Sequence, residues 1–215
     1  MHRGESETAA LSSVTKNEPG PPMATLPTIW FLRHGQTEWN RERRLQGHLD
    51  SPLTAQGIAD AERQARLMQP ILRDNPALFV SPLGRARQTA EIALAGADYR
   101  LDDRLKEIHA GDWQGALMDD LLTSRPDWAA ARPTGLEIYQ AAPGGEGKDA
   151  FVQRIQSFLD DLTEPSVVVA HGLLGQVLRT LACGGDPDRA GQMSNRQGCV
   201  YLLEDGRETV LEPDT

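Results

Sequence analysis

The stretch Thr28-Ile-Trp-Phe-Leu-Arg-His-Gly-Gln-Thr-Glu-Trp-Asn40 carries the most informative pattern in this chain of 215 residues. Its apolar part, Thr28–Leu32, does not alternate with polar residues, which is typical of a strand buried on both faces of a sheet. Arg33, His34 and Gly35 follow at once. Because open parallel sheets bind their ligands at the carboxyl ends of the strands, this order predicts a ligand site with a cation and an imidazole.

Similar apolar runs recur along the chain and alternate with helical patterns. Strands are predicted over Ala77–Val80, Tyr99–Leu101, Ser166–Ala170, Cys199–Leu203 and Glu208–Leu211, the last two joined by a hairpin turn at Asp205-Gly206. Helices are predicted after Thr54, after Ser81-Pro82, over Gly147–Leu162 and over Gly172–Ala182. The alternation predicts an α/β fold, a three-layer α/β/α sandwich with a mostly parallel central sheet.

Two of these helices have recognisable starts. Apolar residues after Thr54 recur in steps of three and four, so Thr54 is the expected N-cap, and the expected inner face is Ile58, Ala61, Ala65, Met68 and Leu72. Ser81 and Pro82 are the expected cap and first turn of the next helix. Its expected inner face is Ala86, Ala90 and Ala93.

The composition limits the class of protein and of partner. Hydrophobic residues make up 39% and charged residues 25%, as in globular proteins. The net charge of −9 disfavours nucleic acids and anionic membranes as partners, because both favour a basic surface. Cys183 and Cys199 lack CxxC spacing, which disfavours a thiolate zinc site and a disulfide framework. We expect reduced thiols and a cytoplasmic location.

The chain divides into a tail and one folded part. Residues 1–25 are rich in Ser, Thr, Glu, Gly and Pro and lack the apolar core of a signal peptide, so we expect a flexible N-terminal tail. Residues 26–215 are expected to form a single domain. Within it, residues 112–145 match no motif and form the expected substrate-capping insertion, whose apolar residues include Trp113, Trp128 and Tyr139.

Three further segments carry polar residues at expected strand ends or in nearby loops. Arg85 lies in Ser81-Pro-Leu-Gly-Arg-Ala-Arg-Gln-Thr-Ala90, and Glu107 lies in Leu105-Lys-Glu-Ile-His-Ala-Gly-Asp-Trp-Gln-Gly115. His171 and Gly172 follow the Ser166–Ala170 strand and begin a helix. We expect all of them to meet Arg33 and His34 at one edge of the sheet.

Together these motifs resemble the histidine phosphatase superfamily, also called the phosphoglycerate mutase-like family, from about Ile29 to about Leu203. The resemblance implies that His34 is a nucleophile that becomes a phosphohistidine and that Glu107 is the proton donor. Arg33 and Arg85 match the phosphate clamp, because guanidinium groups suit phosphoryl oxygens and keep their charge. They should also lower the pKa of His34 and so favour its neutral, nucleophilic form. His171 matches the second histidine, which donates to the phosphate.

The same resemblance assigns secondary positions. The amide of Gly172 adds a donor at a helix N-terminus. Thr37, Asn40 and Gln46 match polar residues around the phosphate pocket. We expect no metal and no cofactor, since two arginines and two histidines take over the role of magnesium in neutralising charge. Arg41, Arg43, Arg44 and Arg87 are expected surface charges, and His48 and His109 match no metal-ligand spacing.

The family holds phosphatases and mutases, and four features favour a phosphatase that acts on a small phosphomonoester. The segment between Glu107 and His171 is too short for the long insertion of cofactor-dependent mutases. Those mutases continue from the acid as Glu-Arg-His-Tyr-Gly, whereas this chain has Ile108 and Ala110 in place of the arginine and tyrosine. Leu173 replaces a polar residue after the late His-Gly, and Pro143-Gly-Gly-Glu146 resembles the phosphatase branch.

Three other functions stay open at the level of sequence. One is a mutase-type phosphotransferase. Another is a binding or regulatory protein with a catalytically weak site, which the complete set of His34, Arg33, Arg85, Glu107 and His171 disfavours. The third is a protein phosphatase, which the 112–145 cap disfavours. The ribazole-phosphate, sugar-phosphate and broad-specificity branches share these motifs, so the sequence leaves the substrate open, as it does the oligomeric state.

Overall fold

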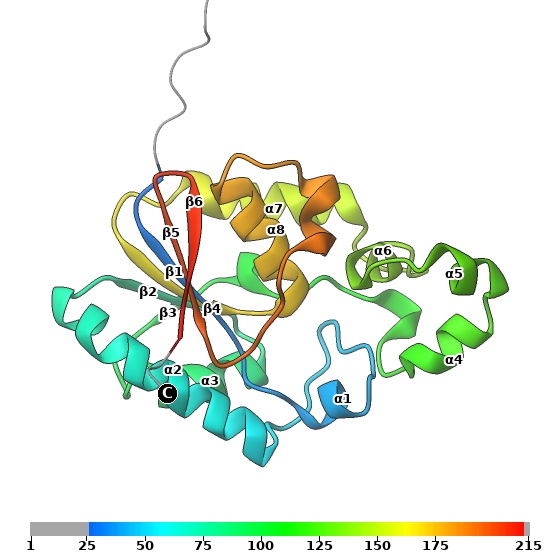
Figure 1. The fold of residues 1–215 in the computed structure, drawn as a ribbon, viewed down its shortest axis with the longest axis horizontal. Helices are drawn as coiled ribbons and strands as arrows, with labels where there is room; N and C mark the ends of the chain where they lie inside the picture. The colour runs from blue at the N-terminus through cyan, green and yellow to red at the C-terminus, as the bar shows by residue number, and fades with distance from the viewer. Residues whose placement is uncertain (1–25, 213–215) are drawn as a thin grey trace, which may run out of the picture.

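A computed structural model describes residues 26–212; the predicted tail, residues 1–25, lies outside them. A six-stranded sheet in the order β3-β2-β4-β1-β5-β6 forms the centre (Figure 1). Its strands are β1 (Ile29–Arg33), β2 (Ala77–Val80), β3 (Arg100–Leu101), β4 (Ser166–Ala170), β5 (Val200–Glu204) and β6 (Arg207–Leu211). The first four pair in parallel, and β5 is antiparallel to both β1 and β6. The predicted mostly parallel sheet is confirmed.

Helices cover both faces of the sheet, which gives the predicted three layers (Figure 1). Successive residues of β1 and β4 point to opposite faces, as the pleat of a strand requires. Phe31 and Val168 pack with α7 (Lys148–Asp160) and α8 (Gly172–Ala182). Leu32 and Val169 pack with α2 (Ala55–Ile71) and α3 (Gly84–Ala93). All five residues of β4 are buried, as the unbroken apolar run predicted.

The inner face of α2 differs from its prediction. Thr54 is the N-cap, as expected, and accepts a hydrogen bond from the amide of Gly57. Ile58 is 43% exposed, however, whereas Asp60 and Gln64 are buried. These two polar side chains face inward because they bind the backbone after β1: Asp60 accepts from the amide of Gln36, and Gln64 donates to the carbonyl of Arg33.

The predicted start of α3 is wrong. The helix begins at Gly84, and its N-cap position, Leu83, has no side chain that accepts a hydrogen bond. The hydroxyl of Ser81 lies 2.7 Å from Nε2 of His171 instead. Ser81 follows β2 directly, so its side chain reaches the neighbouring end of β4 before the helix starts.

Residues 116–140 project to one side of the sheet, shown in green at the right of Figure 1. Between β3 and this segment lie the short turns η2 (Asp103–Leu105) and η3 (Gly111–Trp113). Beyond them lie three short helices: α4 (Met118–Thr123), α5 (Pro126–Ala131) and α6 (Gly135–Gln140). They have an apolar cluster of their own, which includes Trp113, Leu121 and Ile138.

The remaining elements agree with the expected organisation. The helix predicted over Gly147–Leu162 is α7, two residues shorter at its C-terminal end. At the hairpin between β5 and β6, Asp205 and Gly206 have φ values of 50° and 70°, the left-handed conformations that such a two-residue turn requires. The short elements α1 (Glu38–Arg41), η1 (Leu72–Asp74) and η4 (Pro187–Gln192) complete the fold. Across residues 26–212, no helix combines the length and apolarity needed to cross a bilayer.

Candidate active site

The register of the parallel strands places the two motif histidines side by side. Arg33 pairs with Ala170 across β1 and β4, so His34 and His171 are the next residues on neighbouring strands. The amide of His34 donates to the carbonyl of Ala170 at 3.0 Å. The centres of the two imidazole rings are 5.3 Å apart. The two histidines therefore meet at the carboxyl edge of the sheet, as predicted.

A small cavity of about 140 Å³ opens at this edge. Seven of the nine predicted site residues line it: Arg33, His34, Asn40, Gln46, Arg85, Glu107 and Gly172. His171 is fully buried beside His34. Thr37 is also fully buried, and it caps α1 by accepting from the amide of Asn40. The structure therefore places Thr37 as a support for Asn40 and not in the wall of the cavity.

The hydrogen bonds of His34 define its tautomer. Nδ1 lies 2.7 Å from the carbonyl oxygen of Gly35, which only accepts, so Nδ1 carries the proton. Nε2 accepts from Nε of Arg85 at 3.3 Å. Burial lowers the pKa of His34 well below its usual value, and the charges of Arg85 and Arg33 lower it further. The imidazole is therefore neutral near pH 7, with its lone pair on Nε2.

Arg85 is held in a cradle of oxygen atoms. Its guanidinium donates to the carbonyls of Gly47 and Leu49, at 2.9 and 2.8 Å, and to the carboxylate of Asp50 at 3.0 Å. Asp50 also accepts from the amides of Gly84 and Arg85, and so caps α3. The loop from Gly47 to Asp50 thus fixes a buried cation against His34.

Arg33 supplies the second cation. One of its terminal nitrogens donates to the carbonyl of Asn195, while Nε is buried without a partner. Burial lowers the pKa of Arg33, but a guanidinium starts high enough to keep its charge. A buried donor without a partner is costly, and an anion in the cavity would satisfy it.

His171 is the less accessible of the two histidines. Its Nε2 contacts the hydroxyl of Ser81, and Nδ1 is buried without a partner. Burial, followed by the charge of Arg85, lowers its pKa well below the usual value. His171 is therefore neutral near pH 7, with one ring nitrogen unsatisfied within the protein.

Glu107 binds the N-terminus of α8. Its carboxylate accepts from the amides of Leu173 and Leu174, at 3.0 and 2.8 Å, and from the amide of Ile108 at 3.1 Å. His171, the N-cap residue of α8, makes no side-chain cap of its own. A helix N-terminus attracts anions, so the first turn of α8 holds Glu107 beside the cavity. The amide of Gly172 lies at the cavity wall.

The family assignment rests on this geometry together with a sequence match. The profile of the histidine phosphatase superfamily (branch 1) matches residues 29–211, which include all of these groups. The chain belongs to this superfamily. Probable phosphoglycerate mutases GpmB of Enterobacter sp. (strain 638) and Shigella boydii are 37% and 32% identical to it over 189 and 190 residues. The Enterobacter alignment covers 84% of this chain and 86% of the relative.

Solved structures of the superfamily show the same fold. A candidate alpha-ribazole-5′-phosphate phosphatase of Escherichia coli superposes with a TM-score of 0.72 at 27% identity, covering 87% of this chain and 97% of that one. A phosphoglycerate mutase of Thermus thermophilus superposes with a TM-score of 0.66 at 34% identity, covering 87% and 99%. The relatives thus carry the names of both activities.

The structure adds cavity residues that the motifs did not reveal: Gly135, Tyr139, Leu173 and Asn195. The Tyr139 hydroxyl accepts from the amide of Gln46, and burial raises its pKa to about 12. Asn195 lies in the loop before β5, where Gln197 donates to the carbonyl of His34 at 2.9 Å. Nothing in the local sequence marks this loop. The pairing of β5 with β1 brings it to the site.

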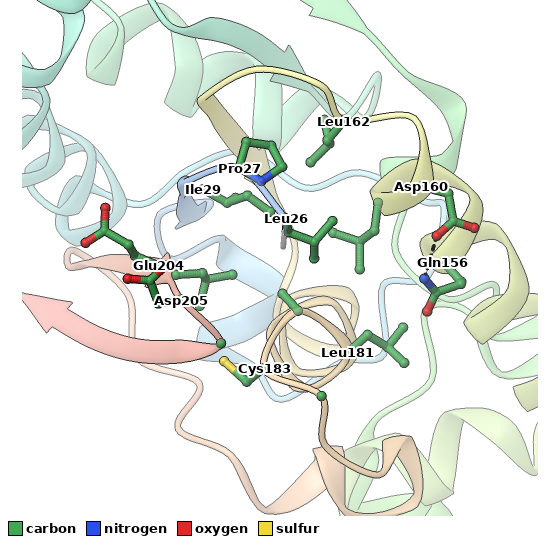
Figure 2. A pocket seen from close by; sticks show the side chains of 15 residues that line it. Leu26, Pro27, Ile29, Gln156, Asp160, Leu162, Leu181, Cys183, Glu204 and Asp205 are labelled. Carbon is green, nitrogen blue, oxygen red and sulfur yellow. Dashed lines mark hydrogen bonds between the residues drawn. The ribbon is translucent and has the colours of Figure 1, made fainter. Parts of the chain in front are cut away.

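Larger cavities lie elsewhere. Figure 2 shows one of about 530 Å³ that includes Ile29, at the start of β1, and Cys183, after α8. The described residues around it include no histidine or arginine. Within residues 26–212, no three histidine, cysteine, aspartate or glutamate side chains group as a metal site would require.

Proposed function

We propose that this protein is a phosphatase that hydrolyses phosphomonoesters through a phosphohistidine on His34. The observation that carries the proposal is the neutral His34, which shares a cavity of about 140 Å³ with the buried guanidinium of Arg85, the half-buried guanidinium of Arg33 and a buried carboxylate. This set supplies a nucleophile, cations for the phosphoryl oxygens and a group that transfers protons.

In the first step, Nε2 of His34 attacks the phosphorus atom. A nitrogen–phosphorus bond forms, the bond to the ester oxygen breaks, and Glu107 gives its proton to the leaving alkoxide. Three backbone amides donate to the Glu107 carboxylate and hold it beside the cavity. Arg33, Arg85 and the amide of Gly172 bind the phosphoryl oxygens, and Nδ1 of His171 supports them.

In the second step, a water molecule attacks the phosphohistidine. Its proton passes to Glu107, the nitrogen–phosphorus bond breaks, and inorganic phosphate leaves. Glu107 then carries the proton that the next cycle needs. His34 regains its lone pair on Nε2, because Nδ1 keeps its proton against the carbonyl of Gly35. No step requires a metal ion or a cofactor.

Two residues after Glu107 support hydrolysis rather than transfer to phosphoglycerate. Ile108 and Ala110 are both fully buried within apolar clusters. They occupy the positions of the arginine and tyrosine in the mutase pattern, so they offer no charge or hydroxyl to a phosphoglycerate. A mutase also has to shield its phosphoenzyme from water, and the short helices α4–α6 form a smaller cap than an insertion of the mutase kind.

The cap supports a small-molecule substrate with a partly apolar leaving group. The phosphate cavity has room for little more than the phosphoryl group. Gly135 lines it and also lines a neighbouring cavity of about 360 Å³ in the cap. That second cavity is mostly apolar, with Met118, Leu122 and Trp128 in its wall. We propose that the leaving group passes Gly135 into this space.

A panel of phosphomonoesters tests the function. We expect the wild-type protein to release phosphate from p-nitrophenyl phosphate and His34→Ala to release none. With 3-phosphoglycerate and 2,3-bisphosphoglycerate together, we expect no mutase product. Rapid formation of 2-phosphoglycerate with slow hydrolysis would instead show a mutase. A wild-type protein that is folded but inactive on every ester would favour a binding or regulatory role.

A further inference from the structure

Two side chains outside the cavity bind the main chain of Glu107. Its carbonyl oxygen accepts from Nε2 of His48 at 2.9 Å and from a terminal nitrogen of Arg154 at 3.1 Å. The two donors approach from different elements, since His48 lies in the loop that cradles Arg85 and Arg154 lies on α7. Neither belongs to the motifs that the sequence singled out as catalytic.

The planarity of the peptide bond links these contacts to the carboxylate. The carbonyl of Glu107 and the amide of Ile108 belong to the same rigid peptide unit. That amide donates to Oε1 of Glu107 at 3.1 Å. Holding the carbonyl oxygen therefore also fixes the direction of an N–H group that binds the carboxylate. Rotation of this peptide would remove one of the three amides on the acid.

Arg154 is itself fixed in place. Its guanidinium forms a two-point ion pair with Glu146, with one contact of 3.0 Å, and donates to the carbonyl of Arg104. Glu146 in turn accepts from the amide of His109 at 3.3 Å. Both charged side chains are largely buried, at 18% and 16% exposure. Arg154 therefore joins α7 to both sides of Glu107 in a segment without long regular structure.

We propose that Arg154 and His48 are positioning residues that set the geometry of proton transfer by Glu107. The proposal rests on the proposed function. A general acid must lie within hydrogen-bond reach of the oxygen it protonates, and a misplacement of about 1 Å costs on the order of 100-fold in rate. In the first step, poor leaving groups depend on that proton and good leaving groups do not. Loss of either contact should therefore slow the two kinds of ester unequally.

Arg154→Lys tests this, because lysine keeps the charge but loses the planar fork. The readout is kcat/KM, which reports the steps up to formation of the phosphohistidine, for β-glycerol phosphate, a poor leaving group, against kcat/KM for p-nitrophenyl phosphate, a good one. We expect about a tenfold loss on the first and less than about twofold on the second. Arg104→Lys is the matched control, since Arg104 also ties this segment to α7, through Ser157 and Asp161, without touching Glu107. Arg104→Lys should leave the ratio of kcat/KM for β-glycerol phosphate to kcat/KM for p-nitrophenyl phosphate unchanged.

His48 allows a test by rescue. His48→Ala should lower the ratio of kcat/KM for β-glycerol phosphate to kcat/KM for p-nitrophenyl phosphate. His48→Gln keeps an N–H donor and should restore most of this ratio. Equal losses on both esters for Arg154→Lys and His48→Ala would overturn the proposal and leave a purely structural role.

The background variant Glu107→Gln separates the two proposals. In the Glu107→Gln background, adding Arg154→Lys should not change the ratio of the two kcat/KM values further. A further change would show that Arg154 acts through a group other than Glu107. If Glu107→Gln itself leaves the ratio unchanged, the proposed acid is wrong. If the wild-type protein hydrolyses neither ester, the proposed function fails.

Discussion

Gly172, the first residue of α8, lies against the side chains of Asn195 and Arg33. A Cβ atom at this position would lie 2.7 Å from Nδ2 of Asn195 and 3.0 Å from Nε of Arg33. Both neighbours line the phosphate cavity. The absence of one side chain therefore lets the backbone amide and a guanidinium share the same small space, which binding of a phosphoryl group requires.

We expect Gly172→Ala to reduce kcat/KM for p-nitrophenyl phosphate by about tenfold or more, with little loss of stability. The atoms that must move belong to polar side chains at the cavity, and alanine favours the helix by about 1 kcal/mol. Gly175→Ala is the matched control on the same helix. Its Cβ atom would lie 2.3 Å from the ring of Phe31 in the core. It should lower the free energy of unfolding by about 1–3 kcal/mol and spare the activity per folded molecule. The reverse pattern would contradict this reading of the site.

Two helices of the site, α3 and α8, take their N-terminal caps from distant loops. Asp50 accepts from the first amides of α3, and Glu107 accepts from those of α8. Each capping carboxylate also lies at the site, because Asp50 pairs with Arg85 and Glu107 lines the cavity. The cap of each helix is thus part of the site, and the same contacts stabilise the fold and orient the charges.

Asp50→Ala should therefore affect stability and binding together. We expect the free energy of unfolding to fall by about 1 kcal/mol, as for the loss of an N-cap, and KM for p-nitrophenyl phosphate to rise because Arg85 loses a partner. Asp50→Asn keeps an acceptor oxygen and should recover most of the stability. Asp103→Ala, which removes only an exposed ion pair with Lys106, is the control and should change neither quantity. Urea denaturation and initial rates give both readouts. An unchanged KM in Asp50→Ala would show that Gly47 and Leu49 hold Arg85 unaided.

These elements also show what the sequence could predict. The cap of α2 by Thr54 was predictable, since the side chain and the amide it binds are three residues apart. The caps by Asp50 and Glu107 were not, because they join residues 34 and 67 positions apart. Ser81 was wrongly predicted to be a cap because a sequence pattern reveals only partners that are near in the chain. Ser81 lies next to α3 in the sequence, but in the structure its hydroxyl lies 2.7 Å from Nε2 of His171, a residue 90 positions away.

At the scale of the whole molecule, strand order assembles the site. The motif residues His34, Arg85, Glu107 and His171 were predictable because each lies in a local pattern. Their meeting follows from the central places of β1 and β4 in the sheet. Asn195 and Gln197 come from a loop without such a pattern, and Arg179 holds that loop by donating to the carbonyl of Ser194. Arg179 also pairs with Glu208 on β6 at 2.8 Å, so the last strand supports the site as well.

Burial of two neutral histidines makes the stability of the whole chain depend on pH. Burial, and then Arg85, holds the pKa of His34 and of His171 well below the usual value of about 6.5. In the unfolded chain both residues take up protons as the pH falls through about 6.5. The unfolded state then binds more protons than the folded state, so the free energy of unfolding decreases as the pH falls. Each histidine contributes a slope of up to about 1.4 kcal/mol per pH unit.

We therefore expect urea denaturation to show a steady loss of stability between about pH 6.5 and pH 5. Asp102 and Glu137 have lowered pKa values, so their contributions are lost only at more acidic pH and do not obscure this range. His34→Gln removes one of the two buried titrating groups and should reduce the slope by up to about 1.4 kcal/mol per pH unit, whatever its effect on stability at pH 7. A wild-type stability that stays constant from pH 6.5 to pH 5 would mean that both imidazoles are protonated inside the fold. A His34 with a pKa near 6.5 would lose the lone pair needed for attack on phosphorus as the pH falls below that value, so hydrolysis of p-nitrophenyl phosphate should then decline over the same range.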